Sequence, residues 1–197
     1  MNEFIYAVWL LPAVFMFHDF EEIIFLQPWL QCKNPLLKAH FPRLAGQIDR
    51  SANRSTSAFA FVVAAEFAVL TAIVVVTVWH AWYALWFAAF LAFFTHLIMH
   101  IGQSIVLRGY VPAVATSLLC MPYCVWVLTL VVRLKMFSFA AAIVLAAVGI
   151  GSGVLLLLGG FMLADRLDKR LSKYGHRTGG NAPAVSTSVE DQCNGKK

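Results

Sequence analysis

The sequence predicts an all-α protein, a polytopic bundle of about five transmembrane helices. Of its 197 residues, 60% are hydrophobic and only 13% are charged, whereas a soluble domain averages about 45–50% apolar and about 25% charged residues. The apolar residues form runs of about 20, the length that an α-helix needs to cross a bilayer. We therefore expect one transmembrane helical domain over residues 1–171, followed by a disordered cytoplasmic tail over residues 172–197.

The first predicted span covers residues 4–26. It contains Pro12, which should kink the helix, and Pro28 should help to end it. A polar and basic connection over residues 28–57 follows, and part of it could lie on the membrane surface as a short amphipathic helix. The remaining predicted spans cover residues 58–79, 82–107, 112–132 and 137–164.

Basic residues predict how the bundle is oriented. The formal net charge is +5, and most Lys and Arg residues lie in the 28–57 connection, at Arg108 and between Arg166 and Arg177. Five spans place these regions on one side of the membrane, which the positive-inside rule identifies as the cytoplasm. We expect the N-terminus outside, the C-terminus inside and a bacterial inner (cytoplasmic) membrane as the location. The expected partner is the lipid bilayer, with no nucleic acid.

Ionisable side chains interrupt three of these spans. A charged group at the centre of a membrane helix costs about 2.5–3.5 kcal/mol on insertion scales, so several in one small protein need a common explanation. At 1.5 Å of rise per residue, the key members lie about 6–16 Å from the cytoplasmic ends of their spans and so share one layer of the bilayer. These members are His18, Glu22, Glu66, His96 and His100.

Helical spacing groups these side chains further. His18, Glu21 and Glu22 stand at i, i+3 and i+4, on one helix face. His96 and His100 stand at i and i+4, the spacing by which one helix offers two imidazoles to a metal ion. We therefore predict a site for one or two divalent ions, of Zn, Fe or Mn. The predicted metal ligands are His18, Glu22, Glu66, His96 and His100.

The ligand set contains more carboxylates than one catalytic zinc ion uses, because such an ion takes three protein ligands and keeps a water position. Two options follow. The site is dinuclear, as in di-iron carboxylate bundles, or Glu21 or Glu22 acts as the catalytic general base beside one ion. The predicted function is metal-dependent hydrolysis or oxidation of a hydrophobic or lipid-like substrate. The predicted substrate contacts are Gln103, Ser104, Arg108 and Tyr110.

Two other functions would use the same residues. An ion- or proton-coupled transporter would use them as a relay, and it would need a water-filled path from the site to both membrane faces. A non-catalytic membrane scaffold would use them only to hold helices together. A scaffold would tolerate Glu66→Gln and would purify without metal.

The residues His18-Asp19-Phe20-Glu21-Glu22 match the pattern His-x-x-Glu-Glu. Together with the histidines of the third span and Tyr110-Val111-Pro112-Ala113 after it, they make the chain similar to the HXXEE-domain family of bacterial membrane proteins. The resemblance covers about residues 5–165. It implies a Tyr-x-Pro-Gly element, which here ends in Ala113 instead of glycine. It implies a membrane protein with a His/Glu site and no particular reaction.

Overall fold

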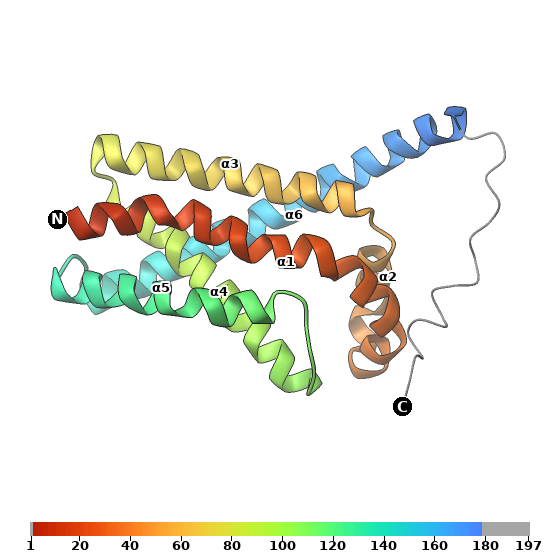
Figure 1. Cartoon of the computed structure of the whole chain (residues 1–197), viewed down its shortest axis with the longest axis horizontal. Coiled ribbons are helices and arrows are strands. Elements are labelled where there is room, and N and C mark those ends of the chain that lie inside the picture. Colours follow the sequence, from red (N-terminus) through yellow and green to blue (C-terminus); the bar gives the residue numbers. More distant parts are fainter. Residues whose placement is uncertain (1, 179–197) are drawn as a thin grey trace.

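The computed structural model describes the backbone of residues 2–178 and the side chains of residues 2–166. No strand occurs in that range, so the predicted all-α class is confirmed. Figure 1 shows the helices in their spatial arrangement. They are α1 (Asn2–His40), the 3-10 helix η1 (Pro42–Leu44), α2 (Ala45–Ala52), α3 (Thr56–His80), α4 (Tyr83–Leu107), α5 (Val114–Arg133) and α6 (Phe139–Thr178).

Among the described residues, four helices are long and apolar enough to cross a membrane: α3, α4, α5 and the Phe139–Arg166 part of α6. They correspond to the last four predicted spans and indicate a membrane protein. The first predicted span lies within α1, which carries three carboxylates over residues 19–22 and is not among these four. However, α1 packs along α3 and α5 (Figure 1), as a fifth span would. The count of five spans therefore stays a prediction.

The prediction for residues 28–57 was wrong about where the first helix ends. Instead of stopping near Pro28, α1 continues through Pro28 and Pro35 to His40. A proline inside a helix costs about 3 kcal/mol when nothing offsets it. Here η1 and α2 fold back onto this part of α1, and Leu30, Leu37 and Ala52 form a small buried cluster. Tertiary packing thus stabilises a helical stretch that its prolines alone disfavour.

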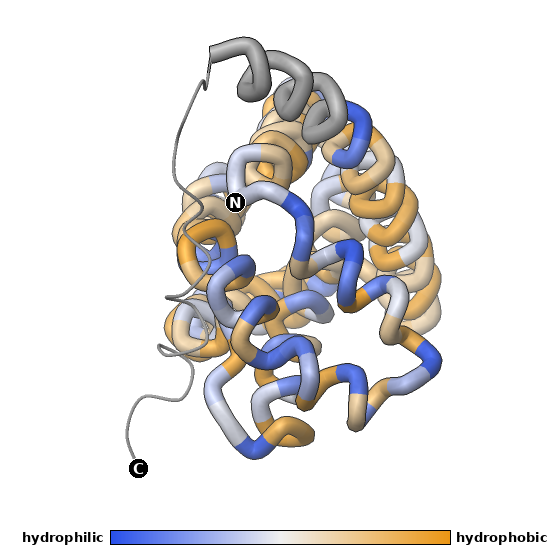
Figure 2. The backbone as a smooth tube through the Cα atoms, turned by 90° about the vertical axis from the view of Figure 1, so that its right-hand side faces the viewer, coloured by the Kyte–Doolittle hydropathy of each residue, from blue (hydrophilic) through white to orange (hydrophobic). Residues whose placement is uncertain are grey.

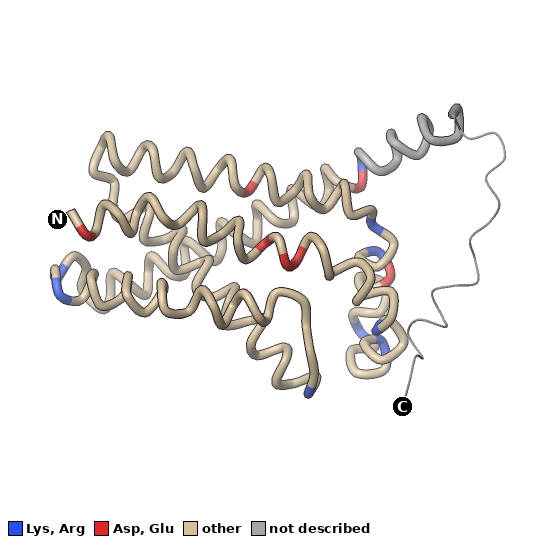
Figure 3. Tube along the Cα trace, in the orientation of Figure 1, with Lys and Arg blue, Asp and Glu red and all other residues tan. Residues whose placement is uncertain are grey.

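Polar contacts also join the C-terminal part of α1 to α2. The Lys38 ammonium lies 2.6 Å from the Asp49 carboxylate, which also accepts a hydrogen bond of 3.0 Å from the Asn34 amide. Most described Lys and Arg residues gather at this end of the bundle, as Figure 3 shows. Viewed end-on in Figure 2, hydrophilic residues mark this segment, whereas the long helices behind it are mainly hydrophobic.

A buried face of α1 sets the position of its functional residues. Phe4, Leu11 and His18 are each 0% exposed and follow one another at intervals of seven residues, so they share one helix face. Phe4 packs edge-to-face on Trp86 of α4, with ring centroids 5.2 Å apart. From α5, the Tyr123 hydroxyl donates a 2.8 Å hydrogen bond to the carbonyl of Ala7. This packing turns His18 toward α4 and α5.

The last helix, α6, packs against α3 and α4. It extends to Thr178, so residues 172–178 of the predicted tail are helical. The rest of that predicted tail lies outside the described residues.

Candidate metal centre

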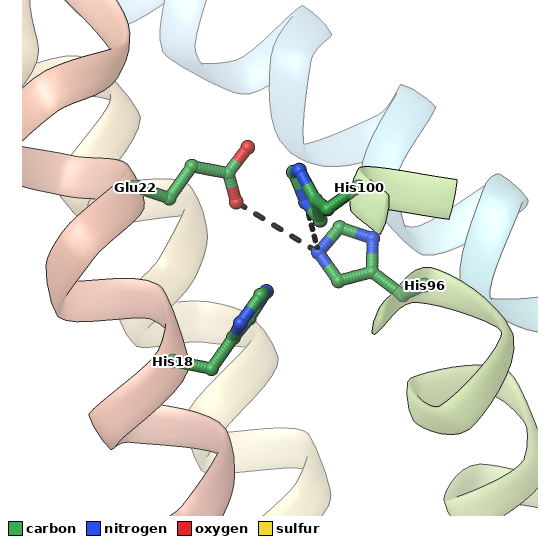
Figure 4. Close-up of side chains that lie close together, drawn as sticks. All are labelled: His18, Glu22, His96 and His100. Carbon is green, nitrogen blue, oxygen red and sulfur yellow. Dashed lines mark hydrogen bonds and ion pairs between the residues drawn. The ribbon is translucent and has the colours of Figure 1, made fainter. Parts of the chain in front are cut away.

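Four side chains from two helices point toward one another, as Figure 4 shows: His18 and Glu22 from α1, and His96 and His100 from α4. Each offers one ligand atom, and these atoms all lie within 4.8 Å of one another. The Nε2 atoms of His96 and His100 are 3.1 Å apart, and His96 Nε2 is 3.8 Å from Glu22 Oε2. Ligands of a tetrahedral zinc ion are about 3.3 Å apart, given bonds of about 2.0–2.1 Å to nitrogen. The group therefore fits one ion after small side-chain movements.

Burial within this group is uneven. His18 is 0% and His100 7% exposed, whereas the side chains of His96 and Glu22 are 39% and 15% exposed. The ring centroids of His18 and His96 are 5.2 Å apart, in an edge-to-face arrangement. These four residues, called the ligand group below, are thus shielded from solvent at His18 and exposed to it at His96.

The surroundings of one ring nitrogen of His18 favour metal binding. Its Nε2 atom is buried and has no hydrogen-bond partner among the described residues. Leaving a buried polar atom unpaired typically costs about 1–3 kcal/mol, so native structures rarely tolerate it without a reason. His100 Nδ1 is unpaired in the same way. A cation bound by His18 Nε2 would remove the first of these two costs.

Glu21 precedes Glu22 in the chain, yet it contacts a different helix. Its Oε2 atom accepts hydrogen bonds from the Thr116 backbone N–H at 2.7 Å and from the Thr116 hydroxyl at 2.6 Å. Its Oε1 atom accepts a 2.6 Å bond from the Tyr110 hydroxyl. The N-cap residue of α5, Ala113, provides no side-chain hydrogen bond. Glu21 therefore caps α5 from outside, where a helix has unpaired N–H groups and favours negative charge.

This geometry changes the role predicted for Glu21. We expected Glu21 or Glu22 to act as a general base, but both Glu21 oxygens are already engaged in hydrogen bonds. The Tyr110 hydroxyl stays protonated as a donor, because desolvation and then the Glu21 carboxylate raise the pKa of Tyr110 well above its usual range. Glu22, in contrast, belongs to the ligand group.

A sequence family described as a protein of unknown function with HXXEE motif matches residues 9–127. That stretch holds the whole ligand group and the Glu21 cap. The chain belongs to the HXXEE family. No curated protein and no solved structure matches it. In this member of the HXXEE family, the histidine and the second glutamate of the motif join the ligand group, whereas the first glutamate caps α5.

The two other acidic residues of the HXXEE site have different positions. Glu66 of α3, a predicted ligand, is not part of the four-residue group, although it interacts electrostatically with His96 and Glu22. Asp19 is only 2% exposed. Its Oδ1 atom lies 3.9 Å from His18 Nε2 and has no hydrogen-bond partner among the described residues.

The residues predicted to contact substrate gather around the turn that follows α4. The Ser104 hydroxyl donates a 2.7 Å hydrogen bond to the Gly109 carbonyl, and Arg108 ends α4 in the left-handed conformation with φ of 49°. The Trp29 indole N–H donates to the Tyr110 carbonyl at 2.9 Å, and Gln103 is exposed. Ser104 and Tyr110 thus have structural partners here, and substrate contact stays a prediction.

Sequence reasoning missed Thr116. Its hydroxyl oxygen lies 3.3 Å from His18 Nδ1 and 2.6 Å from Glu21 Oε2, so one side chain contacts both the histidine and the first glutamate of the motif. The available signal was its place three residues after Ala113, in the first turn of a helix whose start has no polar capping residue.

Proposed function

We propose that this HXXEE protein is a membrane-embedded metalloprotein that binds one divalent ion through His18, Glu22, His96 and His100. The observation that carries the proposal is the convergence of four ligand atoms within 4.8 Å. Three imidazoles and one carboxylate suit Zn, Fe or Mn. A single ion is favoured over two, because Glu66 does not belong to the same group.

The proposed activity is metal-dependent hydrolysis or oxidation of a hydrophobic or lipid-like substrate. Support comes from the 39% exposure of the His96 side chain, which opens the group toward the surface of an apolar helix bundle. A divalent ion bound there would supply Lewis-acid chemistry. Glu66 replaces Glu21 as the proposed proton acceptor, because it interacts electrostatically with His96 and Glu22, whereas both Glu21 oxygens already accept hydrogen bonds.

We further propose that α1 crosses the membrane as a fifth span, with the N-terminus outside and the C-terminus inside a bacterial inner membrane. The packing of α1 against α3 and α5 supports its insertion. The gathering of basic residues at the α2 end supports the orientation (Figure 3). With this topology the ligand group lies in the cytoplasmic half of the bilayer.

Metal content tests the proposal most directly. Detergent-purified wild type should contain about one ion per chain, as expected for a four-ligand site, and His100→Ala should lose most of it. His80→Ala is the matched control, because His80 is exposed at the C-terminal end of α3, away from the ligand group. Equal metal content in wild type and His100→Ala would refute the proposed site.

An ion or proton relay is the second candidate function, and it is favoured by the buried Asp19, whose Oδ1 atom lies 3.9 Å from His18 Nε2 without a hydrogen bond among the described residues. A relay predicts flux through reconstituted vesicles that Asp19→Asn abolishes. A hydrolase or oxidase predicts turnover of an added hydrophobic substrate without such flux. A scaffold predicts neither activity and a metal-free protein.

A further inference from the structure

A hydrogen-bonded chain links the surface of the bundle to His18. It begins at the Tyr110 hydroxyl, which donates to Glu21 Oε1 at 2.6 Å. Glu21 Oε2 accepts the Thr116 hydroxyl at 2.6 Å, and the same Thr116 oxygen lies 3.3 Å from His18 Nδ1. His18 ends the chain with its Nε2 atom beside the other ligands and without a hydrogen-bond partner in the described part of the protein.

The directions of these hydrogen bonds follow from the number of available protons. A hydroxyl has one proton to donate, and an ionised carboxylate only accepts. The shortest contact of the Thr116 hydroxyl is with Glu21 at 2.6 Å, whereas its distances to the carbonyls of His18 and Ala113 are both 3.3 Å. The proton of Thr116 therefore goes to Glu21. The lone pairs of its oxygen are left to accept a hydrogen bond from the N–H group at His18 Nδ1.

A neutral imidazole carries its proton on one nitrogen and a lone pair on the other. We propose that Thr116 is a positioning residue that couples Glu21 to His18, holds the His18 ring with its proton on Nδ1 and so makes Nε2 the metal-binding atom. This inference rests on the proposed metal site. It also gives the first glutamate of the motif an influence on that site without contact with the ion.

The structure separates this role from the capping of α5. Glu21 keeps two donors when the Thr116 hydroxyl is removed: the Thr116 backbone N–H at 2.7 Å and the Tyr110 hydroxyl at 2.6 Å. Thr116→Val removes the hydroxyl at nearly constant volume and leaves the cap in place. Thr116→Ser keeps the hydroxyl. Ser117→Ala is the matched control, because the buried Ser117 hydroxyl bonds to the Ala113 carbonyl at 2.7 Å and to no ligand.

The experiment measures Zn²⁺ affinity by chelator competition and the visible spectrum of the Co²⁺ form, in the full chain in detergent. Outer-shell partners of metal ligands typically change affinity about 10–100-fold, so we expect a loss of that size and an altered Co²⁺ spectrum for Thr116→Val. Thr116→Ser and Ser117→Ala should stay close to wild type. Equal affinity and an unchanged spectrum for Thr116→Val would overturn the inference, while a wild type that binds neither ion would overturn the proposed function itself.

A measurement on wild type needs no variant to fold. Nitrogen-15 NMR of histidine-labelled, metal-free protein distinguishes a protonated Nδ1 from a protonated Nε2. We expect the His18 signal, assigned by its loss in His18→Gln, to show the proton on Nδ1. A proton on Nε2 would contradict the role of Thr116 even if the site binds metal.

Discussion

Gly149 of α6 lies directly against the backbone carbonyl of Ala88 in α4, so close that a Cβ at position 149 would collide with that carbonyl. Small residues allow two helices in a membrane to approach backbone to backbone. Since α4 also carries His96 and His100, this crossing helps to fix the position of the helix that carries the histidine pair.

Gly149→Ala should therefore destabilise the protein. Overpacking at a tight contact typically costs about 1–3 kcal/mol, and here the obstacle is backbone, which cannot rotate away. Thermal unfolding in detergent, followed by circular dichroism, measures the effect. Gly151→Ala is the control, since nothing lies within 4 Å of a Cβ there, and it should be neutral or slightly stabilising. Equal unfolding temperatures for the two variants would contradict the close crossing.

Ala113→Gly should stabilise the turn before α5. Ala113 has φ of 70°, in the left-handed region, which costs a residue with a Cβ about 1–2 kcal/mol. Glycine avoids this strain but has a more flexible unfolded state and removes a buried methyl group, so we expect a net gain of about 0.5–1 kcal/mol. The measurement is again thermal unfolding. Ala115→Gly, in the first turn of the helix, should instead destabilise by about 0.5–1 kcal/mol, and the same sign for both variants would disprove the strain at Ala113.

Substitutions of the two adjacent glutamates of the motif should affect different properties of the protein. Glu21→Gln weakens the cap of α5 and should lower stability by about 1–2 kcal/mol, with about one ion still bound at saturating metal. Glu22→Gln removes a ligand and should reduce metal content sharply while changing the stability of the metal-free protein less. Metal analysis and thermal unfolding of the metal-free forms measure both effects. Identical losses of metal in the two variants would show that Glu21 is itself a ligand.

Arg54→Lys should lower stability by weakening the contact between the segment just before α3 and α6. The Arg54 guanidinium donates two hydrogen bonds, of 3.1 and 3.0 Å, to Asp165 Oδ1 and lies 4.3 Å from the centre of the Phe161 ring. Lysine reproduces neither the paired donors nor the flat stacking surface, so we expect a loss of about 1 kcal/mol. Arg50→Lys is the control, because Arg50 is exposed and, within the described part of the chain, its hydrogen bond goes to the Gly46 carbonyl of α2. A similar unfolding temperature for both variants would argue against a stabilising contact of Arg54 with Asp165 and Phe161.

Sequence reasoning could predict that side chains of different spans lie together, because helical rise and spacing determine depth and face along a span, although it also included Glu66. His18, Glu22, His96 and His100 could be brought together in this way, as the structure shows. The helix that the Glu21 side chain contacts could not be predicted, because this depends on the position of the start of α5 in the folded bundle. Thr116 was missed for the same reason: its importance comes from contacts with residues nearly 100 positions earlier in the chain.

The long helix α1 was missed for a different physical reason. Pro28 and Pro35 are strong local signals against a helix, and the apolar and polar contacts between α1 and α2 outweigh them. Among the four later helices, α5 alone contains an internal proline, Pro122, and it lies within a long apolar run. Their predicted ranges agree closely with α3, α4, α5 and the apolar part of α6.

All four ligands come from α1 and α4, and the whole of α2 and α3 is synthesised between them. During translation His18 and Glu22 are therefore made well before the two histidines that complete the group. In the proposed function, an ion would be held by all four side chains only after α4 has left the ribosome and packed against α1. Metal loading would then be a late step of biogenesis, and a nascent chain that ends after α3 would contain only two of the four proposed ligands.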